Sequence, residues 1–235
     1  MKIVELVFLL CGVCVNTLYL IGNELFMPGY ILLAVALWLS ASALHMAIHE
    51  MGHLIGGLIS GYYLVYFSIG PVNFSYSQKK KFSISIGKSR GGQCVMEPRN
   101  PDTCHYLCYN FGGVVANLLL ALAAGGLLLL GSHFANLFFI NLVCVAAQKI
   151  VMNSIPGIVN GTPNDAFVVK LLTHNEHTQR DYYMYLKLYA SYYREDSIDY
   201  KNYEYYRPLD VAENELLYYR EIKSILAEIN QGVVD

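Results

Sequence analysis

Four long apolar segments constrain what this chain can fold into more than any other feature. They cover about residues 3–21, 30–61, 106–130 and 133–155. As helices, each is long enough to cross roughly 30 Å of hydrocarbon. Of the 235 residues, 55% are hydrophobic and 14% are charged, which is too apolar for an ordinary soluble domain. The sequence therefore predicts an α-helical polytopic membrane protein with about four transmembrane helices.

The polar residues are distributed unevenly along the chain. Twelve of the 18 acidic residues and twelve of the 20 tyrosines lie in residues 174–235. We therefore expect an N-terminal transmembrane helix with an external loop at 1–29, a membrane core at 30–173, and a Tyr-rich, helical cytosolic tail at 174–235. Small tail helices packing on the membrane body, or on one another, are the simpler expectation. The alternative is a docking surface for a protein partner. The net charge of −2 argues against a dedicated nucleic-acid binder.

Residues 62–99 differ from the apolar segments on either side of them. The runs 62–69 and 81–86 are rich in β-branched and aromatic residues, and the second alternates polar and apolar side chains. Gly70-Pro71 and the polar stretch 78–80 interrupt these runs. The pattern predicts short strands or hairpins associated with the membrane body.

Lysine and arginine predict the orientation of the helices in the membrane. The loops at 22–29 and 131–134 contain neither residue, whereas the region between the second and third apolar segments and the tail contain many. By the positive-inside rule, the 62–99 region and both termini face the cytosol. The cations between the two segments are Lys79, Lys80, Lys81, Lys88, Arg90 and Arg99.

The second apolar segment ends in the motif His49-Glu50-Met51-Gly52-His53. Two histidines four residues apart share one face of a helix and can bind Zn²⁺ together, and the glutamate between them can act as a general base on a metal-bound water. The alternative is a coincidental pair of helix histidines. However, placing ionisable groups at bilayer depth costs free energy, so they are rare there unless they have a function. The motif predicts a zinc peptidase, and its position predicts that the site lies within the membrane.

A catalytic zinc usually has three protein ligands, so a third is needed. Asp165 follows a stretch, residues 153–164, in which two prolines and two glycines should break the fourth helix. A broken helix within a membrane is tolerated only where protein or a water-filled cavity surrounds it. Asp165 could supply the third ligand there, or it could simply N-cap the helix that follows it.

Three ordered blocks of the chain resemble the site-2 protease family of intramembrane zinc metalloproteases, over roughly residues 30–172. The first is the histidine motif, followed by a strand-like segment with Ser68-Ile69-Gly70-Pro71. The second is Phe111-Gly112-Gly113-Val114-Val115-Ala116-Asn117-Leu118, similar to the family's Gly-Pro-x-x-Asn stretch. The third is Asn153-x-x-Pro156 leading to Pro163-Asn164-Asp165, similar to the family's Asn-x-x-Pro and Asp-Gly block.

The resemblance implies that His49, His53 and Asp165 are zinc ligands and that Glu50 is the catalytic base. It also makes Asn117 and Asn153 candidates for substrate contacts, with hydrogen bonding between helices as the alternative. His45, one turn before His49, could support the ligand or could simply pack between helices.

The chain departs from the family pattern at two places. Gly113 stands where proline is usual, a change expected to affect only the start of the helix. Ala166 stands where glycine usually follows the aspartate.

The expected activity is hydrolysis of a peptide bond in or near a transmembrane segment of a membrane-embedded protein or peptide. The unwound substrate could be held as an added strand of the 62–99 region. One rival is a non-proteolytic zinc-binding accessory or immunity protein that retained the fold, but metal binding alone does not need Glu50. Another is a membrane-anchored peptidase for soluble substrates. The position of His49 in an apolar segment argues against that.

The predicted topology can be tested with single cysteine labels. Labels near Lys80 and Tyr203 should react only from the cytosolic side, because both positions lie in the regions that are rich in lysine and arginine. Labels near Asn23 and Ser132 should react only from outside. Reaction at residue 80 from the external side would contradict the four-span topology.

Overall fold

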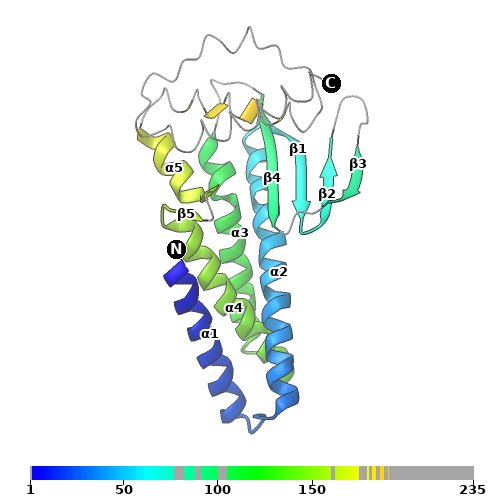
Figure 1. Cartoon of the computed structure of the whole chain (residues 1–235), viewed down its shortest axis with the longest axis vertical. Coiled ribbons are helices and arrows are strands. Elements are labelled where there is room, and N and C mark those ends of the chain that lie inside the picture. Colours follow the sequence, from blue (N-terminus) through cyan, green and yellow to red (C-terminus); the bar gives the residue numbers. More distant parts are fainter. Residues whose placement is uncertain are drawn as a thin grey trace, which may run out of the picture.

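The computed structural model describes residues 2–76, 82–87, 91–99, 105–159 and 162–174, together with residues 179, 182, 183, 186, 187 and 190. Four long helices run side by side and form one bundle (Figure 1). Each is long and apolar enough to cross a membrane, as the sequence predicted. They are α1 (Lys2–Gly22), α2 (Pro28–Ile59), α3 (Tyr106–Leu127) and α4 (His133–Ser154).

The ends of α2 follow from local backbone chemistry. The helix begins at Pro28, two residues before the predicted start, because proline suits the first turn, where its missing N–H has no partner to lose. After Ile59, Gly61 adopts a φ of 79°, a left-handed conformation that glycine tolerates best and that ends helices. Ser60 Oγ donates to the carbonyl of Gly56 and to that of His105, which ties the end of α2 to the beginning of α3.

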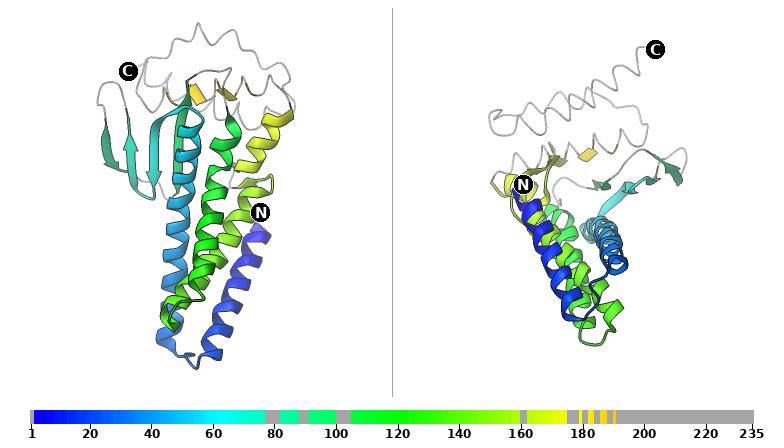
Figure 2. Two further views of the ribbon diagram at one scale, coloured as in Figure 1. Left: turned by 180° about the vertical axis from the view of Figure 1, so that it is seen from behind. Right: turned by 60° about the horizontal axis from the view of Figure 1, so that its bottom comes forward.

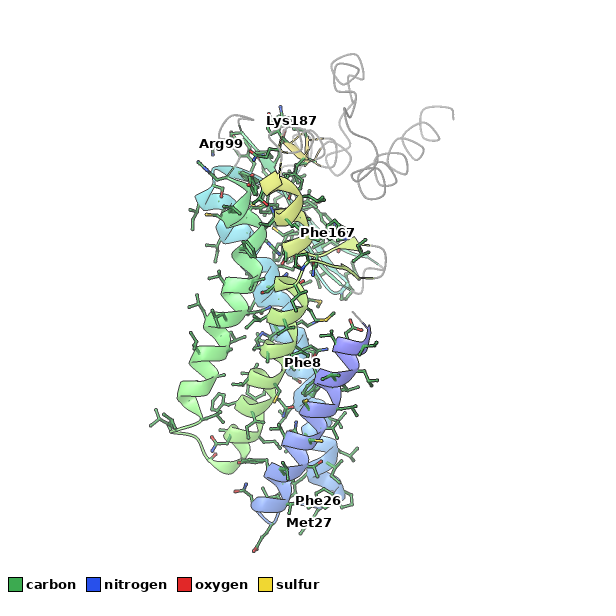
Figure 3. The ribbon with its side chains drawn as sticks, turned by 90° about the vertical axis from the view of Figure 1, so that its left-hand side faces the viewer. Phe8, Phe26, Met27, Arg99, Phe167 and Lys187 are labelled. Carbon is green, nitrogen blue, oxygen red and sulfur yellow. The ribbon has the colours of Figure 1, made fainter. Side chains whose placement is uncertain are left out.

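The helices expose large apolar side chains outward, as the side-chain view shows (Figure 3). Leu32 on α2 and Leu122 on α3 are more than 60% exposed, and similar residues occur along α1. Helices that expose apolar faces of this length suit a lipid environment. In the same view Arg99 and Lys187 lie at the end of the molecule opposite to Phe26 and Met27 (Figure 3). The orientation of these ends in a membrane stays a prediction.

Four strands between residues 62 and 98 form an antiparallel sheet beside one end of α2 (Figures 1 and 2). The sheet is more extended than the predicted hairpins, because β4 returns along β1 and gives the order β3-β2-β1-β4. The predicted break at Gly70-Pro71 is the tight turn that joins β1 to β2, and Gly70 has the positive φ that such a turn needs. The strands are β1 (Tyr62–Ile69), β2 (Val72–Ser75), β3 (Ser83–Ile86) and β4 (Gly92–Pro98).

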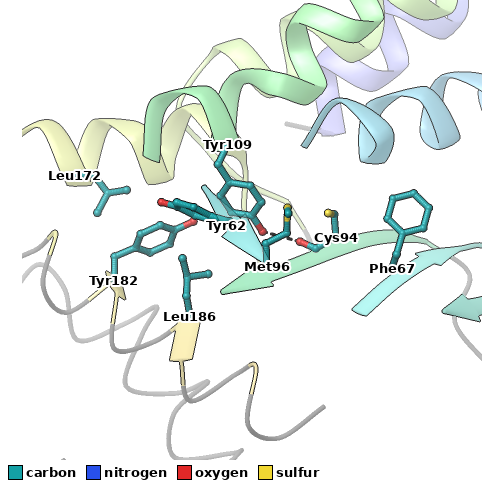
Figure 4. Packing of buried hydrophobic residues seen from close by; sticks show 8 residues of the cluster. All are labelled: Tyr62, Phe67, Cys94, Met96, Tyr109, Leu172, Tyr182 and Leu186. Atoms are coloured by element: carbon teal, nitrogen blue, oxygen red, sulfur yellow. Dashed lines mark hydrogen bonds between the residues drawn. The ribbon is translucent and has the colours of Figure 1, made fainter. Parts of the chain in front are cut away.

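One face of the sheet packs into a buried cluster that also contains residues from the tail (Figure 4). Tyr182 and Leu186 are at most 5% exposed and pack with Tyr62, Met96 and Tyr109. The described tail residues therefore pack on the membrane body, the simpler of the two expectations. Most of the predicted helical tail lies outside the described residues, including most of its tyrosines, and so do the lysines at 79–81.

Beyond α4 the chain breaks and then starts a further helix. A short two-stranded ladder, β5 (Ile158–Val159) with β6 (Thr162–Pro163), separates α4 from α5 (Asp165–His174). This confirms the break expected between residues 153 and 164. It brings the start of α5 back against α3 and the end of α4.

Candidate metal centre

The two motif histidines lie on one face of α2, next to α3. Because they are four residues apart, their rings lie one above the other, and their Nε2 atoms are 3.1 Å apart. The rings meet edge to face, with 4.6 Å between their centroids. Both side chains are mostly buried, at 13% and 11% exposed. The histidine pair is thus preformed at the inner surface of the bundle.

Asp165, at the first residue of α5, faces both histidines. Its Oδ2 lies 3.3 Å from His49 Nε2, and its Oδ1 lies 3.5 Å from His53 Nε2. The break after α4 therefore brings together the three residues that the sequence analysis selected. Among the described residues they form a group whose ligand atoms could hold one metal ion.

The spacing of these three residues fits zinc. For a tetrahedral zinc ion with bonds of about 2.0–2.1 Å, neighbouring ligand atoms lie about 3.3–3.4 Å apart. The two Nε2 atoms are 3.1 Å apart, and they lie 3.3 and 3.5 Å from one or the other carboxylate oxygen of Asp165, which is close to that value. Asp165 Oδ2 is also buried without a hydrogen-bond donor, and a bound cation would satisfy it. Two imidazoles and a carboxylate leave a fourth position for water or substrate.

Asn164, which the sequence analysis did not select, positions Asp165. Its side-chain oxygen accepts hydrogen bonds from the backbone N–H groups of Gly157 and Phe167, and its amide donates to the carbonyls of Met152 and Ile155. One side chain thus closes the end of α4 and caps the start of α5. The alternative that Asp165 caps this helix is wrong, because Asn164 does so and leaves the aspartate free to face the histidines. The strong N-cap preference of asparagine was the available signal.

Glycines allow α2 and α3 to approach closely at the site. A Cβ at Gly52 would collide with the backbone carbonyl of Gly112, and a Cβ at Gly56 would collide with that of Cys108. The four-residue spacing of Gly52 and Gly56 puts both on the face of α2 that meets α3, as in small-residue contacts between membrane helices. The approach also lets His53 Nδ1 lie 2.7 Å from the carbonyl oxygen of Tyr109. A ligand histidine bonded in this way keeps its Nε2 lone pair for a metal.

Gly113 has a larger role than the sequence analysis assigned to it. The helix α3 begins at Tyr106, so Gly113 lies two turns inside it, and the expectation that this position affects only the helix start was wrong. A Cβ at residue 113 would lie 2.5–2.8 Å from three atoms of the His49 ring. Glycine here makes room for the His49 ring.

The two asparagines that the resemblance singled out lie in different environments. Asn117 is fully buried, and its carboxamide lies 2.9 Å from His45 Nδ1 and 3.2 Å from His49 Nδ1. These contacts are hydrogen bonds between helices. Asn153 donates to the carbonyl of Lys149 within α4. A role for either residue in binding substrate stays a prediction.

Glu50 is 8% exposed and faces the beginning of β4. A Cβ at Gly92 would lie 2.5–2.9 Å from three atoms of the Glu50 side chain, so this glycine leaves room for the carboxylate. Burial raises the pKa of the neighbouring Cys94 thiol, and the negative charge of Glu50 raises it further, so Cys94 stays protonated and unreactive. Neither Gly92 nor Cys94 was expected at the site, because only the return of β4 brings them there.

Comparison of the chain with protein-family models, with curated proteins and with solved structures finds no match.

The metal centre makes a direct prediction about zinc content. Purified protein should hold about one zinc per chain, and His49→Ala, His53→Ala and Asp165→Ala should each remove most of it, because each removes one of three ligands. Metal analysis after dialysis gives the stoichiometry. His105→Ala, at an exposed histidine before α3, is the control and should keep its zinc. Full occupancy in Asp165→Ala would mean that the third ligand is misassigned.

Gly113→Ala should weaken zinc binding without removing a ligand. The added methyl group must push the His49 ring away from its place, so the affinity should fall by at least about tenfold. Chelator competition measures the change. The matched control is Gly125→Ala in the same helix, where a Cβ would meet nothing within 4 Å. Equal zinc affinity in the two variants would contradict the contact between Gly113 and His49.

Proposed function

We propose that this chain is an intramembrane zinc metalloprotease, with His49, His53 and Asp165 as metal ligands and Glu50 as the general base. The convergence of two imidazoles and a carboxylate at the spacing of a tetrahedral ion carries the proposal. The two histidines sit on a helix that is long and apolar enough to cross a membrane, and a buried glutamate stands next to His49 in the chain. The resemblance to site-2 proteases, stated on the sequence blocks, agrees with this arrangement.

Each residue has a defined part in the proposed reaction. When bound, Zn²⁺ supplies a Lewis acid that polarises the scissile carbonyl and makes water a nucleophile near neutral pH. Glu50 takes a proton from the attacking water and returns it to the leaving amine. Burial of Glu50 against the beginning of β4 limits the access of other water to the carboxylate.

The proposed substrate is a transmembrane segment or a membrane-bound peptide. A helical peptide bond must first unwind, since its carbonyl is already hydrogen-bonded. The beginning of β4 lies against Glu50, so a substrate strand that pairs with this part of the sheet would present its backbone next to the base. We further propose that both termini are cytosolic and that the site lies in the cytosolic half of the membrane. Lysine and arginine gather between the second and third apolar segments and in the tail, and the histidine motif lies at the end of the second segment.

Glu50→Gln tests the proposal and separates it from a non-proteolytic zinc-binding accessory protein. The variant should keep its zinc, since Glu50 is not a ligand, but lose the positioned base. Cleavage of a generic single-span substrate in proteoliposomes should fall by at least about 10²–10⁴-fold. Glu5→Gln on α1 is the control and should cleave normally.

The same variant should bind substrate without releasing it as product, and would then capture the natural substrate in cells. Wild-type cleavage by Glu50→Gln would reject the protease proposal. The histidine and aspartate cluster would then be a structural metal site.

A further inference from the structure

A pair of buried polar side chains, one on α2 and one on α3, lies about one helical turn from the proposed ligand His49. His45 on α2 and Asn117 on α3 are both fully buried. The chain of contacts runs from the carbonyl oxygen of Leu142 on α4 to His45 Nε2, at 2.9 Å, and from His45 Nδ1 to the Asn117 carboxamide. It continues from that carboxamide to His49 Nδ1. One set of hydrogen bonds therefore links α4, α2 and α3 and ends on a ligand histidine.

The first contact determines where the protons lie along this chain of contacts. The Leu142 carbonyl can only accept, so His45 Nε2 must carry a hydrogen. A neutral His45 ring then has a lone pair at Nδ1, which needs a donor. The two ends of a carboxamide have nearly the same shape, and their partners decide which end is nitrogen. The structure places Asn117 Oδ1 toward His45 Nδ1 and Asn117 Nδ2 toward His49 Nδ1. With that orientation His45 would need a hydrogen on both nitrogens and would be a fully buried cation without a counter-charge, which is costly. A neutral His45 therefore requires the exchanged orientation, in which the NH₂ group of Asn117 faces His45.

In this exchanged orientation the oxygen of Asn117 faces His49 Nδ1. An oxygen at that place requires a hydrogen on Nδ1, and a neutral His49 ring then has its lone pair on Nε2. That lone pair points toward His53 and Asp165, where a metal would bind. His53 reaches the same state more simply, because its Nδ1–H donates to the carbonyl of Tyr109.

We propose that His45 and Asn117 are positioning residues that hold His49 in the tautomer able to bind the metal. The proposal rests on the metal site proposed above and adds two residues that are not metal ligands themselves. Hydrogen-bond partners of this kind orient a ligand ring and raise its basicity. The fully buried position of His45 then has a function besides helix packing.

A comparison within the same bundle distinguishes positioning from simple helix pairing. Asn16 on α1 and Asn141 on α4 form two reciprocal hydrogen bonds, of 3.1 and 3.0 Å. This buried pair joins two helices but has no contact with the ligands. Asn16→Leu therefore removes a bond between helices of the same chemical type and leaves the contacts of His49 intact.

The test measures zinc affinity of the full-length protein in detergent by chelator competition, with no cleavage assay. His45→Leu and Asn117→Leu should each weaken zinc binding by about 10–100-fold, because His49 loses its hydrogen-bond partner or that partner's support. His45→Gln should restore affinity to within about threefold, since glutamine can accept from Asn117 and donate to Leu142 in the same order. Asn16→Leu should bind zinc as the wild type does.

Three results would overturn the proposal: unchanged affinity in folded His45→Leu and Asn117→Leu, equal weakening in Asn16→Leu, or no recovery in His45→Gln. Thermal melting checks that each variant is folded, and if Asn117→Leu is not, the comparison of His45→Gln with His45→Leu decides. A wild-type protein that binds no zinc would instead reject the metal site itself. The two failures can therefore be told apart.

Discussion

The close contact between α2 and α3 is the interaction on which the rest of the site depends. Gly52 and Gly56 let the two backbones approach until a methyl group would collide with a carbonyl. Three features of the site need this approach: the bond from His53 to the Tyr109 carbonyl, the place of Asn117 between two imidazoles, and the fit of the His49 ring against Gly113. A wider helix spacing would leave the histidines on α2 but would remove the groups that orient them.

Most of the buried polar side chains in this apolar bundle have hydrogen-bond partners that offset the cost of burying them. An unpaired polar group inside a membrane protein costs several kcal/mol, so partners must come from neighbouring helices. Asn16 pairs with Asn141, and Asn164 satisfies four backbone groups around the helix break. Asp165 Oδ2 is an exception among the described residues, and it lies where the metal is proposed. Three other buried side-chain atoms of the described residues also have no partner, and none of them belongs to the proposed metal site: Ser68 Oγ, Asn73 Oδ1 and Asn136 Oδ1.

The sheet and the tail connect the site to the end of the molecule that carries Arg99 and Lys187. The carbonyl of Tyr109 accepts a hydrogen bond from His53 Nδ1, and the hydroxyl of Tyr109 donates to the carbonyl of Cys94 on β4. The next residue, Asn110, accepts a hydrogen bond from the hydroxyl of Tyr182. The first turn of α3 thus contacts a proposed metal ligand, the strand beside Glu50 and the described part of the tail.

The sequence by itself determined the four long helices, the break before Asp165 and the helical pairing of His49 with His53, because these depend on local composition and spacing. It left open whether Asp165 caps a helix or faces the histidines. Only the tertiary structure decided that, since the capping bonds of Asn164 involve backbone groups on both sides of the break. The tertiary structure also decided the roles of Gly92, Gly113 and His45. These roles depend on contacts between segments up to about a hundred residues apart, such as that of His45 with Leu142. Periodicity within one helix carries no information about such distant neighbours.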